Sequence, residues 1–173
     1  PLQHILGFAW FRRVRLQVRP GVFVPRPETE VVAGAAIDAA LAIAGRDPVV
    51  VDLCTGSGAI AASIAGEVPT AHVIAVDVDP AAVALARTNL AAFGDRARVD
   101  RADITVPGLL AELTGSVDVL VSNPPYIPPD AVPIDTEVRE HDPQRALYGG
   151  GADGLDVPRD VVASAIRLLR TGG

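Results

Sequence analysis

The most constraining feature of the sequence is an apolar run that passes directly into a glycine-rich loop and then into a helical pattern. Val49–Leu53 has the composition of a buried strand, Cys54–Gly58 has the sequence Cys-Thr-Gly-Ser-Gly, and a helix is predicted over about residues 59–65. Such a loop lets the backbone approach a ligand closely and points the helix N-terminus at it. The sequence therefore predicts an α/β fold with a ligand at the carboxyl end of this strand.

The residues after the loop extend this prediction. The loop and its helix have the spacing G-x-G-x-x-A of dinucleotide-binding proteins, a match that is weak by itself. A second strand, His72–Asp77, ends in an acid about 20 residues past the loop, where a carboxylate commonly binds ribose hydroxyls. Asp77 could instead cap the next helix. Asp79 followed by Pro80 is the better cap, which leaves Asp77 free for a ligand.

Two further strands complete the predicted sheet. Residues 98–103 form a weaker third strand, and Asp103 at its end either reads an adenine amino group or is a solvated loop acid. A short helix or loop over residues 106–113 precedes the fourth strand, whose apolar residues Val119–Val121 are typical of a strand covered on both faces. With the strand order 3-2-1-4, strands one and four end side by side at the switch point where ligands bind in such sheets.

The fourth strand ends in a stiff polar elbow, Asn123-Pro124-Pro125-Tyr126. Neither proline can donate a hydrogen bond to a ladder, and Pro124 favours an extended backbone at Asn123. These residues predict a fixed amide side chain and a fixed carbonyl beside an aromatic ring. A plain turn is the alternative, since Asn and Pro are common turn residues.

The elbow suits the methylation of an amide or amino nitrogen. An amide nitrogen is a poor nucleophile, so a site that methylates it needs acceptors for both of its N–H groups. The Asn123 side-chain oxygen and the Pro124 carbonyl could each accept one, which would aim the nitrogen at an electrophilic methyl group. Tyr126 could pack against the flat amide or an adjacent base.

The remaining segments are predicted to border this core. Residues 8–18 have the pattern of a short β-hairpin with a charged face. Residues 21–30 form a stiff link in which Arg26 and Glu28 either make structural ion pairs or belong to a cover over the cleft, before a helix to about Ile43. Residues 127–154, rich in Pro, Asp and Gly, are expected to pass over the site. A last helix from about 156 to 169 is expected to face inward with Val161, Val162, Ala165, Ile166 and Leu169.

Composition limits the possible functions. The chain of 173 residues has the size of one domain, and its net charge of −6 argues against binding nucleic-acid phosphates. The single cysteine excludes an internal disulfide and fits a reducing compartment, so we expect a cytoplasmic protein. No membrane span, signal peptide or histidine–cysteine metal spacing is evident. The absence of methionine and the start at Pro1 indicate a processed product or a piece of a longer protein.

The motifs together resemble the class I S-adenosyl-L-methionine-dependent methyltransferases and, more narrowly, the HemK/PrmC family of peptide chain release factor protein-(glutamine-N5) methyltransferases. The resemblance covers essentially the whole chain, and its most specific part is Arg-Pro-Glu-Thr-Glu combined with the elbow. Asn-Pro-Pro-Tyr alone also occurs in adenine-N6 DNA methyltransferases. The segments that carry the resemblance are Pro1–Gly7, Phe23–Glu30, Asp52–Gly58, Asn123–Tyr126 and Gly149–Leu155.

The resemblance implies a Rossmann-like fold, with a mostly parallel sheet, helices on both faces and a short β-hairpin before it. Residues 1–25 would form the hairpin and linker, and residues 26–173 the catalytic domain. The family normally has a helical substrate-recognition domain before these residues and further strands after them, so we expect the chain to be a piece of such a protein. The implied substrate is a release factor, with no membrane or direct nucleic-acid partner, and the protein is expected to be a monomer.

The resemblance also implies a role for each motif residue. The cofactor would be S-adenosyl-L-methionine, and the product S-adenosyl-L-homocysteine. Asp77 would bind the ribose of the cofactor, and Asp103 and Ile104 would flank its adenine. The methionine part would be bound by the loop residues Cys54, Thr55, Gly56, Ser57 and Gly58. Asn123 would contact both cofactor and substrate, and Pro124, Pro125 and Tyr126 would bind the glutamine amide. Asn123, Pro124 and Tyr126 are the implied catalytic residues, and no metal is expected.

Three positions depart from the family pattern. Cys54 stands where glycine is common, and Ile104 stands where an aromatic side chain often stacks on adenine. His141-Asp142-Pro143 replaces a commoner Tyr-Glu-Pro in the segment that passes over the site.

Other functions remain open at this point. The chain could methylate an amino group of another protein or adenine N6 in nucleic acid. The glycine pattern also permits an NAD-dependent dehydrogenase, which would leave the elbow unexplained. A fourth reading is a module that binds the cofactor and only docks a release factor.

Overall fold

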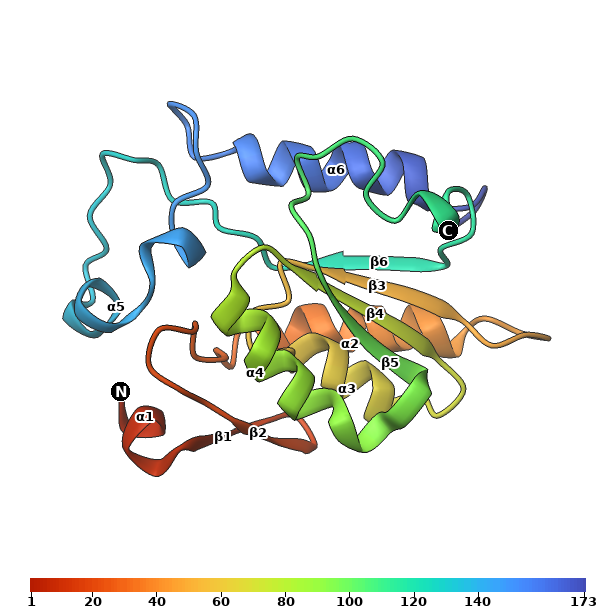
Figure 1. Cartoon of the computed structure of the whole chain (residues 1–173), viewed down its shortest axis with the longest axis horizontal. Helices are drawn as coiled ribbons and strands as arrows, with labels where there is room; N and C mark the ends of the chain where they lie inside the picture. The colour runs from red at the N-terminus through yellow and green to blue at the C-terminus, as the bar shows by residue number, and fades with distance from the viewer.

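A computed structural model describes all residues, 1–173, and contains two sheets (Figure 1). The first is an antiparallel hairpin, as predicted for residues 8–18. The second is a parallel sheet with the order β5-β4-β3-β6, which confirms the predicted order 3-2-1-4. The strands are β1 (Phe8–Phe11), β2 (Val14–Gln17), β3 (Val49–Leu53), β4 (His72–Asp77), β5 (Ala97–Arg101) and β6 (Val119–Ser122).

Six α-helices and three short 3₁₀ helices connect the strands. The α-helices are α1 (Leu2–Leu6), α2 (Thr29–Leu41), α3 (Ala59–Glu67), α4 (Pro80–Leu90), α5 (Thr136–His141) and α6 (Asp156–Leu168). The 3₁₀ helices are η1 (Ala91–Arg96), η2 (Ala111–Leu113) and η3 (Gln144–Ala146). The sequence pattern did not predict α1 or α5, which have five and six residues and are too short to show a helical period. The longest helices, α2 and α6, have 13 residues each, and none of the helices could span a bilayer.

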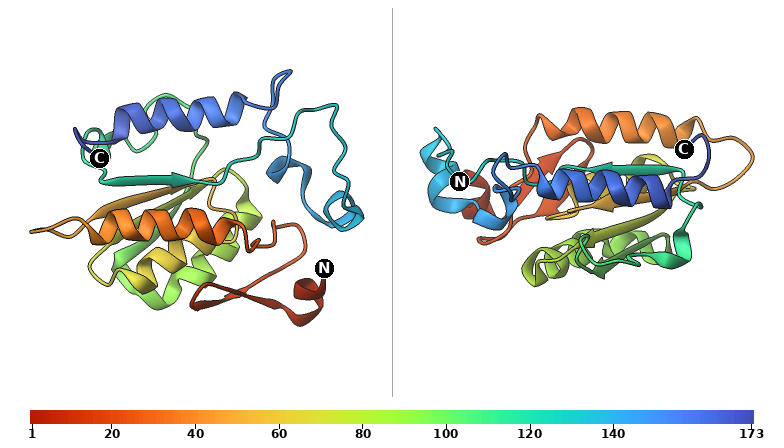
Figure 2. Two further views of the ribbon diagram at one scale, coloured as in Figure 1. Left: turned by 180° about the vertical axis from the view of Figure 1, so that it is seen from behind. Right: turned by 90° about the horizontal axis from the view of Figure 1, so that it is seen from above.

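Helices cover both faces of the parallel sheet, as Figure 2 shows from behind and from above. α2, α3 and α4 pack on one face, while α6 and the turn around Leu109 pack on the other. The core on the side of α2–α4 is called the first core, and the core on the side of α6 is called the second core. Because successive strand residues point to opposite faces, Val50 belongs to the first core and Val51 to the second. Phe11 and Leu16 of the hairpin are also buried in the first core, so the hairpin packs on the same face as α2–α4.

β6 is less covered than expected. Val121 is buried, but Val119 and Leu120 are only half-buried. Both faces of the run are nevertheless covered, as predicted, because Val119 and Val121 pack in the core beside α2–α4 and Leu120 packs against the core beside α6. β6 is the edge strand of the sheet and pairs with β3 alone.

The inner face of α6 also differs from the prediction. Val162 and Ile166 are 58% and 80% exposed, whereas Ser164 and Leu168 are buried. The buried stripe follows the i, i+3, i+7 spacing from Val161, and positions 162 and 166 lie about 100° and about 140° around the helix from Val161. The prediction assigned every apolar residue of the helix to its inner face, which made the predicted buried stripe wider than the observed one.

Candidate functional site

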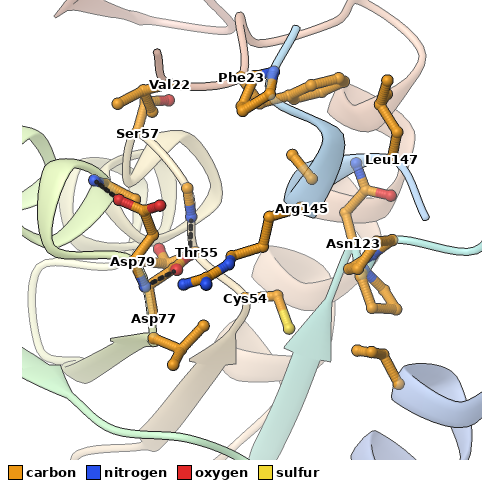
Figure 3. Close-up of a pocket in the computed structure, with 18 of the residues that line it drawn as sticks. Val22, Phe23, Cys54, Thr55, Ser57, Asp77, Asp79, Asn123, Arg145 and Leu147 are labelled. Atoms are coloured by element: carbon orange, nitrogen blue, oxygen red, sulfur yellow. Dashed lines mark hydrogen bonds between the residues drawn. The ribbon is translucent and has the colours of Figure 1, made fainter. Parts of the chain in front are cut away.

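A cavity of about 300 Å³ opens at the carboxyl ends of the parallel strands. Its walls come from the link before α2, the glycine loop after β3, the ends of β4 and β5, the elbow after β6, and the segment around η3 (Figure 3). The predicted site residues that line it are Cys54, Thr55, Gly56, Ser57, Asp77, Asp103, Ile104, Asn123, Pro124, Pro125 and Tyr126. The topology therefore brings four separate motifs into one pocket.

Gly58 is the one predicted site residue that does not line this cavity. It precedes α3 in a left-handed conformation, with φ of 81°, and faces α4. A Cβ at this position would lie 3.0 Å from Leu90 and 3.2 Å from Ala86. Glycine is therefore needed here for close helix packing behind the loop.

Asp52 holds the glycine loop from beneath. Its Oδ2 accepts hydrogen bonds from Thr55 Oγ1 at 2.6 Å and from the backbone N–H of Ala61 at 3.2 Å. The carboxyl group is fully buried, and this burial raises its pKa from 3.8 to about 7. The sequence analysis gave this residue no role beyond the end of a strand.

Asp77 connects the loop to the next strand. Its Oδ2 accepts the Gly56 N–H at 2.8 Å, and its Oδ1 accepts the Asp79 N–H at 2.9 Å (Figure 3). Asp79 caps α4 as predicted, accepting from the N–H groups of Ala81 and Ala82. Asp77 was expected to be free of protein contacts, but both of its carboxylate oxygens accept backbone N–H groups. It still faces the pocket, and each oxygen keeps a further lone pair. Burial raises its pKa.

Cys54 adopts a left-handed backbone conformation, with φ of 57°, at the first position of the loop. Its thiol lies in the pocket (Figure 3). Burial raises the pKa of the thiol to about 12, so it remains protonated near neutral pH and is a poor nucleophile. The geometry supports a packing role for this side chain.

The loop after β5 supplies Asp103 and Ile104, because the strand ends at Arg101 and not at residue 103 as predicted. Asp103 is exposed, and its Oδ1 accepts hydrogen bonds from the Thr105 N–H at 2.9 Å and from Thr105 Oγ1 at 2.8 Å. These bonds lower its pKa. Ile104 is half-buried and packs against the second core. Asp103 is therefore solvent-accessible and also lines the pocket, and a contact with an adenine amino group stays a prediction.

The elbow presents two acceptors that have no partner within the chain. The Asn123 side-chain N–H₂ donates to Thr29 Oγ1 at 3.2 Å, which leaves Oδ1 without a hydrogen bond. The Pro124 carbonyl likewise accepts no hydrogen bond. Ser122 Oγ donates to the Leu53 carbonyl at 2.6 Å and holds the elbow beside the end of β3. Tyr126 lies at the rim and is 61% exposed.

The segment of residues 127–154, called the lid below, returns to the elbow. The Leu147 carbonyl accepts the N–H groups of Tyr126 at 3.1 Å and Ile127 at 2.8 Å. A Cβ on Gly149 would lie 2.6 Å from the Pro125 carbonyl oxygen, so only glycine permits this approach. As expected, the lid passes over the site, since Pro143 and residues 145–148 line the pocket.

An ion pair joins the lid to the link before α2. Arg26 donates to the buried Asp142 carboxylate at 2.6 Å. Arg26 thus makes a structural ion pair and also lines the pocket with Phe23 and Pro25, whereas Glu28 does neither. The unusual His141-Asp142-Pro143 thus supplies the carboxylate that anchors the lid.

Thr29 and Arg145 are among the pocket residues that the sequence analysis did not predict. Thr29 was assigned only to the start of a helix, and Arg145 stands in a segment whose path could not be predicted. The structure contains no group of three or more metal-ligating side chains.

A parallel sheet with this strand order, a glycine loop after β3 and an acid after β4 defines a Rossmann-like α/β protein with a ligand pocket at its switch point. The family model described as "Methyltransferase small domain" matches residues 14–139, and the chain belongs to this family.

The chain is similar over its full length to proteins named release factor glutamine methyltransferase. It is 53% identical to the one from Mycolicibacterium smegmatis and 50% identical to the one from Streptomyces coelicolor. It spans 59% and 60% of those two proteins, so it corresponds to about three-fifths of their length.

A solved structure shows the same fold. Geranyl diphosphate C-methyltransferase from Streptomyces coelicolor A3(2), in complex with Mg²⁺, geranyl diphosphate and S-adenosyl-L-homocysteine, has a TM-score of 0.53 and 16% identity. The similarity covers 83% of this chain and 41% of that one, and it concerns the fold alone.

Proposed function

We propose that this protein binds S-adenosyl-L-methionine in the pocket and transfers its methyl group to the side-chain amide nitrogen of a glutamine in a peptide chain release factor. The observation that carries the proposal is the meeting of the glycine loop and two unpaired acceptors, Asn123 Oδ1 and the Pro124 carbonyl, in one cavity. The similarity to release factor glutamine methyltransferases supports the substrate class.

The pocket residues fit this cofactor. Gly56 has φ of 57° and no atom within 4 Å of where a Cβ would be, so a ligand can approach its backbone closely. Asp77 offers its remaining lone pairs for ribose hydroxyls from a position fixed by two backbone N–H groups. When bound, S-adenosyl-L-methionine supplies an electrophilic methyl group on a positively charged sulfur.

The elbow would orient the substrate amide. The Asn123 Oδ1 atom and the Pro124 carbonyl would accept its two N–H groups, so that the nitrogen lone pair faces the methyl group. These acceptors also favour the positive charge that develops on the nitrogen during transfer. Thr29 holds the Asn123 amide in the orientation that exposes its oxygen. Tyr126, at the rim, would pack against the amide plane.

The decisive experiment measures radiolabelled methyl incorporation into purified release factor. The protein should label wild-type factor and leave unlabelled a factor whose target glutamine is replaced by alanine. Asn123→Ala should lower the rate by about 10²-fold, the scale for loss of one preorganised polar contact, while the affinity for S-adenosyl-L-homocysteine falls only modestly. Near wild-type turnover by Asn123→Ala would reduce the elbow to a turn.

Calorimetric titration separates this proposal from a dehydrogenase. Under this proposal the pocket should bind S-adenosyl-L-homocysteine in preference to NAD. Binding of NAD without binding of S-adenosyl-L-methionine or S-adenosyl-L-homocysteine would reject the proposal. The proposed reaction would take place in the cytoplasm with a release factor as partner, and light scattering during gel filtration should show a monomer.

A further inference from the structure

Arg145 is a cation in the pocket that no part of the chain neutralises directly. It belongs to η3 in the lid, and its side chain extends across the cavity towards the ends of β3 and β4 (Figure 3). Its guanidinium makes no hydrogen bond and no ion pair with any residue of the chain. Arg26, the other arginine that lines the pocket, is by contrast paired with Asp142.

The backbone that carries Arg145 is fixed over the pocket on both sides. Three residues before it, the buried Asp142 binds Arg26 of the link. Two residues after it, the Leu147 carbonyl accepts N–H groups from Tyr126 and Ile127 at the elbow. The position of Arg145 above the cavity therefore follows from the way the lid is anchored, and only its side chain is left to rearrange around a ligand.

The surroundings place Arg145 at the acidic end of the cavity. Asp77, Asp79 and Asp103 all line this pocket. The pKa of Asp103 is lowered chiefly by its bonds to Thr105, and the charge of Arg145 adds to this effect. A guanidinium stays charged at every accessible pH, so the three carboxylates at this end of the cavity attract it even without a direct ion pair.

Ile104 offers an aliphatic surface to the same cavity. It is half-buried against the core below the sheet edge and offers an aliphatic contact to a flat ligand, while no aromatic ring stands at that position. A guanidinium is planar and weakly hydrated, so it stacks well on aromatic and heterocyclic rings. Arg145 reaches the same cavity from the lid, on the side away from the sheet.

We infer that Arg145 lies over the adenine ring of the bound cofactor, so that the base is held between this guanidinium on the lid side and Ile104 on the sheet side. The inference rests on the proposed function, because it takes an adenosyl ligand as the occupant. It makes Arg145 a residue that sets affinity for the adenosine moiety, without contact with the reacting atoms.

The test is calorimetry on the 173-residue chain with two probes, S-adenosyl-L-homocysteine and adenosine, the latter measured by displacement. Arg145→Ala should weaken both ligands by about tenfold, as expected for loss of one base-stacking contact. Arg145→Lys keeps the charge but loses the plane, and it should lose most of the same affinity. Arg139→Ala and Arg139→Lys, in α5 of the same lid but outside the pocket, are the matched controls and should bind both ligands as the wild type does.

Each other result overturns the inference. A loss for S-adenosyl-L-homocysteine without a loss for adenosine would mean that Arg145 binds the carboxylate of the amino-acid part. Full retention by Arg145→Lys would mean that charge alone matters, and tighter binding by Arg145→Ala would mean that the arginine obstructs the pocket. Failure of the wild-type chain to bind either probe would instead reject the proposed function, which separates the two failures.

Discussion

Thr29 holds the side-chain amide of Asn123 by a hydrogen bond. An asparagine side chain can present either its oxygen or its N–H₂ group, and the two are opposite in hydrogen-bonding character. The Thr29 hydroxyl accepts from the N–H₂ group at 3.2 Å, and so the oxygen is left for the pocket. A donor in that place could not accept an amide proton from a substrate.

Thr29→Val should therefore lower the rate of methyl transfer by about tenfold, the equivalent of one lost hydrogen bond, because the Asn123 amide loses its fixed orientation. The variant keeps the shape of the side chain, so the affinity for S-adenosyl-L-homocysteine should change little. Single-turnover kinetics and calorimetry on the same preparations give the two values. Thr29→Ser retains the hydroxyl and should keep the wild-type rate; equal rates for all three proteins would contradict the role of Thr29.

The site residues that could be predicted are those whose neighbours in sequence already define their chemistry. The loop residues 54–58 and the elbow 123–126 are contiguous, and their glycines and prolines restrict the local backbone. Thr29 and Asn123 are 94 positions apart, so their contact depends on the packing of α2 beside β6. Arg145 lies in the pocket only because of the path that the lid takes. The lid sequence has no helical or strand periodicity from which this path could be predicted.

At the scale of elements, the contact between the lid and the elbow fixes the shape of the pocket. The Gly149 N–H donates to the Ile127 carbonyl at 3.2 Å, and residues 127 and 148 form a parallel bridge. This close backbone approach explains why the lid returns to the point where it left the sheet.

Gly149→Ala should disrupt this contact. The new Cβ would lie 1.9 Å from the Gly154 carbonyl oxygen and 2.6 Å from that of Pro125, both of them backbone atoms that cannot rotate away. We expect the free energy of unfolding to fall by about 1–3 kcal/mol, with weaker binding of S-adenosyl-L-homocysteine as the lid shifts. Urea unfolding and calorimetry measure the two effects.

Gly66→Ala is the matched control for this variant. A Cβ at Gly66 of α3 would have only ordinary contacts, 3.6 Å from Val14 and 3.7 Å from Phe93. Because alanine favours a helix more than glycine does, stability should stay the same or rise by up to about 1 kcal/mol. If the two variants had the same stability, the contact at Gly149 would not constrain the lid.

The elements themselves were predicted unequally. β3 and β4 match the expected bounds because apolar runs bounded by Gly, Asp and Pro restrict where a buried strand can begin and end. α6 was placed correctly, but its inner face was not. Val162 and Ile166 are as apolar as the residues that do face the core, and apolarity alone does not determine the rotation of a helix about its axis.

At the scale of the whole molecule, one buried carboxyl group joins the stability of the fold to the shape of the pocket. Asp52 lies under the glycine loop between β3 and α3, with Oδ2 bound to Thr55 and Ala61 and with Oδ1 lacking any partner. An ionised carboxylate in such a place costs folding free energy, which is why burial raises the pKa from 3.8 to about 7.

The sign of the resulting pH dependence follows from proton binding. Between about pH 4 and pH 7 the folded protein keeps the Asp52 proton, whereas the unfolded chain has released it. The folded state therefore binds more protons in this range, and the contribution of Asp52 to stability falls as pH rises from about 4 to about 7. Above that range both states are ionised, and the contribution is constant.

Asp52→Asn should remove this contribution, because asparagine does not titrate and its side-chain oxygen can still accept from Thr55 and Ala61. Relative to the variant, the wild type should lose on the order of 2–4 kcal/mol of unfolding free energy between pH 4.5 and pH 8. Urea unfolding of both proteins at the two pH values gives this difference of differences, in which groups common to both cancel. Asp130→Asn makes the same charge change at an exposed lid position and is the control. A wild-type-minus-variant difference that does not change with pH would show that Asp52 is ionised throughout, and that the glycine loop rests on a charged carboxylate.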